Sequence, residues 1–223
     1  MILIPAFQPI KHVGTGSFVA AEVLARWYDK GQVITPSNIK ANVNWGVVDI
    51  EVAKFIQNNL PLCRDQYRAL FINVSEQTLV TDSFYYAWAE IINQIAKTRI
   101  AKIVIEITEG VQDASLANRW GSLANLGGEF ALDDYGDEHS TMARLNKYAW
   151  HYCKFDANRL HSLVDYPAIC YCRDNGIQLI AEQIETPFQE EGAKLFGLLL
   201  QQGFYHGEPT VLGKYMNCVK ALS

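Results

Sequence analysis

The sequence lacks any apolar segment that could cross a membrane, since nowhere do about 18 apolar residues run together. Its first residues, MILIPAF, contain no basic leader, and this apolar run is too short for a signal peptide. No stretch rich in Pro, Gly or Ser and no shift in composition divides the chain. We therefore expect a single domain over residues 1–223, located in the cytoplasm and without a membrane partner.

Cysteine pairs and basic runs are absent as well. The chain has five cysteines, with no CxxC pair and no companion histidine at zinc-ligand spacing: Cys63, Cys153, Cys170, Cys172 and Cys218. We expect them to be reduced packing residues. The net charge is −5, and without a basic cluster the chain has no electrostatic footprint for a nucleic-acid polymer.

What is present indicates a packed α/β protein. Apolar residues make up 49% and charged residues 19% of the chain, which is the balance of a globular and not of a disordered protein. Short β-branched runs alternate with helical segments, and such βα units build parallel sheets. The expected strands are 18–26, 69–74, 102–107, 129–134, 151–156, 177–182 and 198–202, and the expected helical segments are 55–60, 85–95, 117–126 and 168–175.

An additional apolar run over residues 2–10 precedes these units. The connection 11–17, KHVGTGS, is too short for a crossover helix, so the first two strands are expected to be antiparallel. A phosphate-binding loop at Gly14–Gly16 is the alternative. It is disfavoured because no third glycine follows and the next element is a strand, so we interpret this stretch as a hairpin turn.

Polar side chains recur where the expected strands end. They are Glu22, Asn73, Glu106, Asp133, Asp134, Lys154, Glu182 and Gln202. In a barrel of parallel strands these ends meet at the C-terminal mouth, where catalytic groups are placed. Each one could instead be a helix cap or a surface end. As a set they are difficult to explain by packing, because buried ionised groups are costly unless they are paired or bind a metal.

Five carboxylates in one pocket would repel one another and any anionic substrate unless cations are bound. Oxygen-rich ligands suit hard divalent ions such as Mg²⁺ or Mn²⁺. The adjacent Asp133 and Asp134 suggest a pair of ions, because one of the two side chains can bridge. Two such ions serve phosphoester hydrolysis by stabilising both the attacking and the leaving oxygen.

Eight short stretches follow one another along nearly the whole chain: FQPI (7–10), AEVLARW (21–27), FINVS (71–75), EITE (106–109), ALDDYG (131–136), KFD (154–156), AEQIET (181–186) and QGFYHGEP (202–209). In this order they resemble the bacterial EAL-domain cyclic di-GMP phosphodiesterases. The name-giving triplet reads Glu22, Val23 and Leu24 here, which keeps the acidic residue. The resemblance implies a TIM-like (β/α)8 barrel with an antiparallel first strand, two Mg²⁺ or Mn²⁺ ions, and hydrolysis of cyclic di-GMP to linear pGpG.

The resemblance also implies residue roles. Glu22, Asn73, Glu106 and Asp133 would hold one metal ion, and Asp133, Asp134 and Glu182 the second. Lys154 would hold the nucleophilic water or the scissile phosphate, although a barrel lysine simply paired with carboxylates is a compatible alternative. Glu185 resembles an acid near Lys154, and Glu109 one that anchors the loop after the double aspartate. Substrate contacts are expected at Gln8, Leu24, Arg26, Asp156, Gln202 and Pro209.

One loop departs from the family pattern. Where the family has approximately DFGTGYSSL, residues 134–142 read DYGDEHSTM, so Glu138 replaces the second glycine and Asp137 adds charge. We expect a different loop path or strain at this position. Because this family loop couples dimerisation to metal binding, the departure leaves two hypotheses. One is an active phosphodiesterase, with a homodimer that is weakened or rearranged. The other is an EAL module that binds cyclic di-GMP or a protein partner without cleaving it, as an adaptor.

Overall fold

The computed structural model describes residues 1–29, 32–39 and 42–215, and its centre is a closed eight-stranded barrel. The order of strands around the barrel is β10, β11, β2, β3, β6, β7, β8 and β9. Their bounds are β2 Ala6–His12, β3 Ser17–Leu24, β6 Ala69–Val74, β7 Lys102–Ile107, β8 Glu129–Leu132, β9 Tyr152–Asp156, β10 Gln178–Glu182 and β11 Leu200–Gln202. The predicted barrel is confirmed.

Strand β2 runs antiparallel to both of its neighbours, β3 and β11, whereas the other barrel strands run parallel to one another. The antiparallel start predicted from the short connection is therefore confirmed. The connection is a tight turn in which Gly16 adopts φ +73°, a value that glycine accepts without a steric cost. Because β3 begins at the N-terminal end of the barrel, the turn lies at that end, which we call the floor, opposite the mouth.

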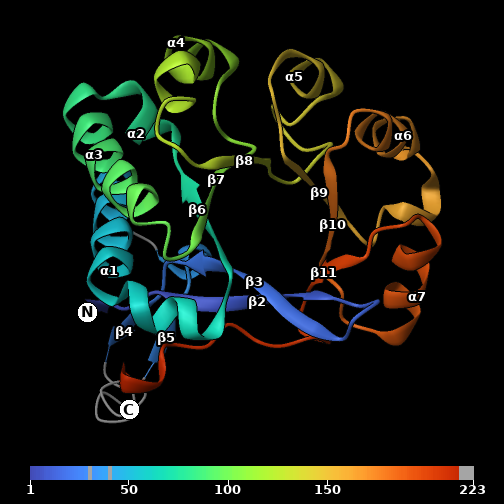
Figure 1. Cartoon of the computed structure of the whole chain (residues 1–223), viewed down its shortest axis with the longest axis horizontal. Helices are drawn as coiled ribbons and strands as arrows, with labels where there is room; N and C mark the ends of the chain where they lie inside the picture. The colour runs from blue at the N-terminus through green and yellow to red at the C-terminus, as the bar shows by residue number, and fades with distance from the viewer. Residues whose placement is uncertain (30–31, 40–41, 216–223) are drawn as a thin grey trace.

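Helices cover the outside of the barrel, with α1 and α3 on one side and α6 and α7 on the opposite side (Figure 1). The helical elements are η1 Pro36–Asn38, α1 Trp45–Gln66, α2 Glu76–Val80, α3 Asp82–Thr98, α4 Asp113–Leu123, α5 Met142–Lys147, η2 Leu160–Ser162, α6 Tyr166–Asp174, α7 Pro187–Leu195 and η3 Gly213–Tyr215. None of the helices in the described ranges is both long and apolar enough to span a membrane.

The structure extends the predicted elements in two places. The apolar run 2–10 is two strands, because β1 Ile2–Leu3 leaves the barrel and forms a side sheet with β4 Trp27–Asp29 and β5 Gln32–Ile34. Helix α1 is 22 residues long, of which only 55–60 was expected. Its start carries a capping signal, since the side chain of Asn44 accepts a hydrogen bond from Val47 N.

The interior of the barrel is layered. A compact apolar cluster fills its middle and includes Ile10, Phe71, Val104, Tyr152 and Ile180. A larger apolar cluster lies between the strands and the surrounding helices. Cys63, Cys153 and Cys172 are buried in this outer core, Cys170 is partly buried, and Cys218 lies outside the described residues. With the apolar layer beneath it, the mouth end of the barrel interior can be polar.

Candidate metal centre at the mouth of the barrel

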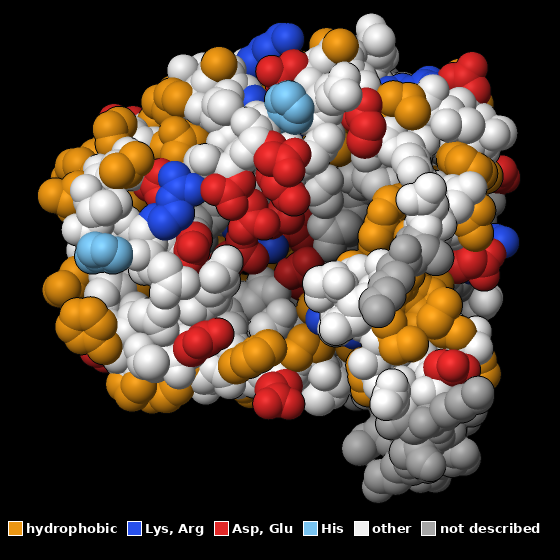
Figure 2. Space-filling model, turned by 180° about the vertical axis from the view of Figure 1, so that it is seen from behind, with side chains coloured by type: hydrophobic (Ala, Val, Ile, Leu, Met, Phe, Trp, Pro, Cys, Tyr) orange, Lys and Arg blue, Asp and Glu red, His pale blue; other side chains and the backbone are white. Residues whose placement is uncertain are grey.

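Four buried carboxylates surround one buried ammonium at the mouth. Lys154 Nζ lies 2.6 Å from Glu182 Oε1, 2.9 Å from Asp133 Oδ1 and 3.3 Å from Glu22 Oε2, and it also pairs with Glu106. Three of the carboxylates lie near the ends of β3, β7 and β10, and Asp133 directly follows β8. In a parallel barrel such strand ends, although distant in the sequence, meet at one end of the barrel. Figure 2 shows acidic side chains gathered around a hollow near the centre of one face of the molecule.

Two amide side chains orient Glu22 within this group. Asn73 Nδ2 donates to Glu22 Oε1 at 2.9 Å, and Gln202 Nε2 donates to Glu22 Oε2 at 2.6 Å. Gln202 Nε2 also lies 3.2 Å from Gln8 Oε1, so the antiparallel strand β2 contributes Gln8 to the mouth from its first half. Both oxygens of Glu22 are thereby fixed in place.

The titration properties of the group follow from burial and mutual repulsion. Burial raises the pKa of Glu106 and of Glu182 well above the usual value, despite the opposing effect of Lys154. Burial would also raise the pKa of Glu22, but Lys154 and the hydrogen bonds from Gln202 and Asn73 bring it below the usual value. The four carboxylates raise the pKa of Lys154 well above normal, against the effect of its burial, so this lysine is a permanent cation.

Asp134 adds a fifth carboxylate beside the group. It adopts φ +42°, a left-handed conformation that aspartate tolerates better than most residues. Burial, and then the charge of Asp133, raise the pKa of Asp134 to about 7. Carboxylate oxygens of Glu109, Asp133 and Asp134 lie within 4.8 Å of one another. The sequence predicted Glu109 only as a loop anchor, so its proximity to both aspartates was missed.

The donor set fits divalent cations. One ammonium cannot neutralise five carboxylates, and several buried oxygens of the mouth have neither a hydrogen-bond nor an ion-pair partner among the described residues: Glu106 Oε2, Glu182 Oε2 and Gln202 Oε1. Buried acceptors left without partners are costly, and ionised carboxylates and amide oxygens are what Mg²⁺ and Mn²⁺ prefer. The residues present therefore suit one or more hard cations.

Two cavities open at the mouth and share Asp134. The acidic cavity has a volume of about 400 Å³ and is lined by Gln8, Glu22, Asp133, Asp134, Lys154, Glu182, Gln183, Glu185, Gln202, Gly203 and Phe204. The adjoining cavity, about 560 Å³, includes Leu24, Arg26, Trp45, Asn73, Glu109 and Asp134 in its lining. Together they offer an acidic compartment next to a second one that combines apolar walls with a single arginine and the acidic residues Asp49, Glu76, Glu109 and Asp134.

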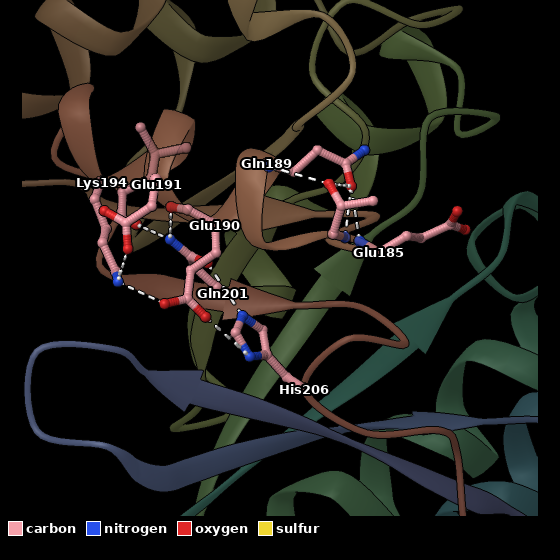
Figure 3. Close-up of polar contacts among 9 residues, drawn as sticks. Glu185, Gln189, Glu190, Glu191, Lys194, Gln201 and His206 are labelled. Atoms are coloured by element: carbon pink, nitrogen blue, oxygen red, sulfur yellow. Dashed lines mark hydrogen bonds and ion pairs between the residues drawn. The ribbon is translucent and has the colours of Figure 1, made fainter.

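Three of the predicted site residues need separate description. Glu185 is exposed at the edge of the acidic cavity, and its side chain extends away from the group formed by Glu190, Lys194 and His206 (Figure 3). Asp156 lines neither mouth cavity, and its carboxylate accepts hydrogen bonds from Asn158 N and Nδ2 at 2.8 and 2.9 Å. Pro209 also lines neither, and lies next to the bridge between Phe7 and Thr210.

A buried aspartate on α1 supports the adjoining cavity and was not predicted. Asp49 Oδ2 accepts from Ser75 N at 2.9 Å, from Ser75 Oγ at 2.7 Å and from Thr78 Oγ1 at 2.5 Å. These bonds join α1 to the start of α2, whose N-cap Ser75 lies two residues after Asn73. A charged residue within the apolar stretch VVDIEVA was the available sequence signal, since such a residue requires a buried partner.

The loop that follows the double aspartate is held by Arg159, which pairs with one loop residue and with Asp165 at the start of α6. Arg159 donates to Asp137 Oδ1 at 2.8 Å and to Asp165 Oδ1 at 3.0 Å. His139 N donates to the backbone oxygen of Glu109 at 3.2 Å, which connects the loop to the segment just after β7. Glu138 adopts φ +35°, so the residue that replaces the family glycine is in a conformation that favours glycine. The predicted strain is present at this position.

Comparison with known proteins identifies a family and a fold. The family described as "EAL domain" matches residues 2–209. The probable cyclic di-GMP phosphodiesterase PdeG of Escherichia coli (strain K12) is 24% identical over 239 aligned positions, which cover 99% of this chain and 46% of PdeG. The chain thus spans less than half the length of that relative.

Two solved structures share the fold. The Bacillus subtilis YkuI protein, solved with cyclic di-GMP and calcium, matches with a TM-score of 0.77 at 20% identity over 99% of this chain and 60% of its own. Klebsiella pneumoniae BlrP1, solved with manganese and the same dinucleotide, matches with a TM-score of 0.73 at 19% identity, covering 95% of this chain and 57% of its own. At these identities the likeness establishes the barrel.

Proposed function

The chain belongs to the EAL domain family, and from that premise we propose that it hydrolyses cyclic di-GMP to linear pGpG with two divalent metal ions. The observation that carries the proposal is the group of four carboxylates around Lys154, with Asp134 beside it and with its unpartnered buried oxygens. The relatives named for cyclic di-GMP hydrolysis, and the complexes of YkuI and BlrP1 with that dinucleotide, support the choice of substrate.

The proposed ligands are those implied by the family. Glu22, Asn73, Glu106 and Asp133 would hold one ion, and Asp133, Asp134 and Glu182 the other. When bound, the ions supply activation of water and neutralisation of phosphate charge. Glu109, whose carboxylate lies close to Asp133 and Asp134, offers a further oxygen beside them.

The chain's own residues complete the chemistry. In the net reaction the oxygen of water bonds to one phosphorus atom, and the bond from phosphorus to the 3′ oxygen breaks with its electron pair left on that oxygen. One O–H bond of the water breaks, and that proton ends on the 3′ oxygen. Lys154, a permanent cation, would stabilise negative charge that develops on the phosphoryl oxygens. Gln202 and Asn73 would orient Glu22 toward a bound ion, because each donates a hydrogen bond to one of its oxygens.

The adjoining cavity would receive one end of the dinucleotide. Arg26 contributes a planar donor that can pair with a phosphate through two hydrogen bonds. Its guanidinium is half buried and donates to Ala25 O at 2.8 Å, which leaves further N–H groups for a ligand. Leu24 and Trp45 provide apolar walls against which a guanine ring could pack.

A second candidate function, binding without cleavage, is favoured by the altered loop. Asp137 and Glu138 bring charge close to the carboxylates, and Glu138 is strained. The deciding experiment incubates purified protein with cyclic di-GMP and Mg²⁺ or Mn²⁺ and separates the products by chromatography. Formation of pGpG by the native chain, but not by Asp133→Asn, supports the phosphodiesterase. Saturable binding without any pGpG would establish the adaptor. Asp174→Asn, which removes an exposed carboxylate on α6, is the matched control.

A further inference from the structure

A third cavity lies at the opposite end of the barrel, at the floor. It has a volume of about 380 Å³ and is lined by residues from seven barrel strands and one flanking position: Ile10, His12, Val19, Ala20, Arg68, Ala69, Phe71, Lys102, Tyr152, Gln178 and Leu200. A volume of this size lies within the range of sites for small molecules. It is separated from the mouth by the apolar layer, so it belongs to neither mouth cavity.

The cavity exists because small side chains occupy inward positions of neighbouring strands. Ala20 pairs in register with Ala69, and both methyl groups face a space that larger residues would fill. Phe71 and Tyr152 close the inner end, with ring centroids 5.0 Å apart in an edge-to-face arrangement. The inner wall is therefore apolar and aromatic, and it suits the hydrocarbon part of a ligand.

The rim of the cavity carries a surplus of one positive charge. Lys102 pairs with Glu129 at 3.0 Å, and Glu129 also accepts from the Tyr152 hydroxyl, so that pair is neutral. Arg68 has no ion-pair or side-chain hydrogen-bond partner within the described residues. His12 Nδ1 accepts from Thr15 N at 3.2 Å, which leaves its other ring nitrogen as a donor in the neutral tautomer. The rim thus offers an unpaired guanidinium and an imidazole N–H.

We infer that the floor of the barrel binds a small monocarboxylate, with its apolar body against Phe71, Ala20 and Ala69 and its carboxylate on Arg68. A carboxylate matches the two parallel donors of a guanidinium, and a single negative charge balances the surplus at the rim. The volume suits an aryl or medium-chain acid. This inference is independent of the proposed function, because it uses none of the residues of the mouth.

The test uses 2-naphthoate as the probe and the full chain labelled at its alanine methyl groups. In a titration followed by NMR, the methyl signals of Ala20 and Ala69 shift and saturate, whereas the signal of Ala25, which lines the adjoining cavity at the mouth, does not move. Uncharged 2-naphthamide binds roughly tenfold more weakly, since it lacks the charge-assisted hydrogen bonds.

Two arginine variants separate a specific contact from net charge. Arg68→Gln weakens naphthoate binding roughly tenfold, and Arg64→Gln, which removes the same charge from an exposed side chain in the last turn of α1, outside the cavity lining, leaves it unchanged. Both side chains are exposed, so both variants fold. Equal losses in the two variants, equal binding of acid and amide, shifts confined to Ala25, or no saturable binding would each overturn the inference.

Discussion

The ammonium of Lys154 lies 2.6 Å from a carboxylate oxygen of Glu182, and both side chains are buried at the mouth of the barrel. The same ammonium contacts three further carboxylates. Lysine is thus the internal counterion of a site whose negative charge exceeds what it can neutralise. This relationship has consequences for stability as well as for turnover.

Replacing Lys154 by methionine is expected to lower kcat by at least about a hundredfold with little change in substrate affinity, because its charge would act mainly in the transition state. Without metal, the variant is also destabilised by about 3 to 5 kcal/mol, since buried carboxylates lose their counterion. Kinetics, together with urea unfolding in EDTA and in Mn²⁺, measure both effects. Lys97→Met, at an exposed position, is the control. An unchanged kcat with a raised KM would make Lys154 a simple binding residue.

Metal removal is expected to abolish hydrolysis, and EDTA should also lower the thermal midpoint, because the unpartnered oxygens of Glu106 and Glu182 lose their countercharge. Glu22→Ala and Asp133→Ala should abolish turnover and reduce the stabilisation by Mn²⁺. Ca²⁺ is expected to inhibit, since it prefers longer and looser coordination. The measurements are product chromatography and melting curves across a metal titration. Full turnover by Asp133→Ala would contradict the proposed ligand set.

Glycine at position 138 is expected to stabilise the fold by about 1 kcal/mol, because Glu138 adopts a left-handed backbone conformation. Glu138→Ala provides the matched control, since alanine removes the charge but keeps the strain. Urea unfolding of the three proteins measures the difference. If Glu138→Ala and Glu138→Gly are equally stable, the backbone is not strained at this position.

Restoring the family loop by Asp137→Thr with Glu138→Gly is expected to raise turnover and to change self-association. Asp137→Thr removes a partly exposed ion pair with Arg159, which contributes at most about 1 kcal/mol. Turnover and sedimentation across a concentration series at fixed Mg²⁺ test this, with Asp137→Asn as a control that removes charge alone. If neither quantity changes, the altered loop is neutral for both functions.

Protonation of His206 is expected to destabilise the fold as the pH falls below about 6.5. Burial, and then the charge of Lys11, lower the pKa of His206, whereas Glu190 opposes the shift. The unfolded chain therefore takes up the proton first, so stability is present above the unfolded pKa and is lost as the pH falls toward the folded pKa.

Figure 3 shows the environment that the proton would enter. Gln201 Nε2 donates to Glu190 O and Leu198 O, so its Oε1 must accept from His206 Nε2 at 3.1 Å. His206 Nδ1 then faces Glu190 Oε2 at 3.8 Å, and Lys194 already pairs with that carboxylate group. Unfolding free energies at pH 7.5 and 5.5 should differ less in His206→Gln than in the native chain. His161→Gln, at an exposed histidine, should behave as the native chain does.

The sequence predicted the barrel because its strands are apolar and its polar groups are placed at the strand ends. Strand β6 and strand β7 have the expected bounds, since each is a continuous buried run. Helix α7 was missed, although Thr186 and Gln189 form a capping box at its start, because its residues are too polar to show a strong periodicity. Capping signals would have been the better guide there.

For the candidate site, the sequence could predict that the polar residues at the strand ends lie together, but it could not predict the individual side-chain contacts. The group around Lys154 follows from strand order alone, since inward positions at the ends of parallel strands must meet. The partners of Asp137 and Asp49 could not be predicted, because Arg159 and Ser75 reach them from other elements through loop geometry. The same holds for the cavity at the floor, which depends on the register that places Ala20 beside Ala69.

The direction of strand β2 determines where foreign sequence can be accommodated. Because β2 runs against its neighbours, the turn between β2 and β3 emerges at the floor, and its residues 14–17 are exposed. A reporter domain inserted between Gly14 and Thr15 would leave the barrel from the end remote from the carboxylates. Such a fusion keeps the mouth open to a cyclic dinucleotide. The inserted domain would lie beside His12 and would cover the floor cavity. Access to the floor cavity can therefore be blocked without blocking the mouth.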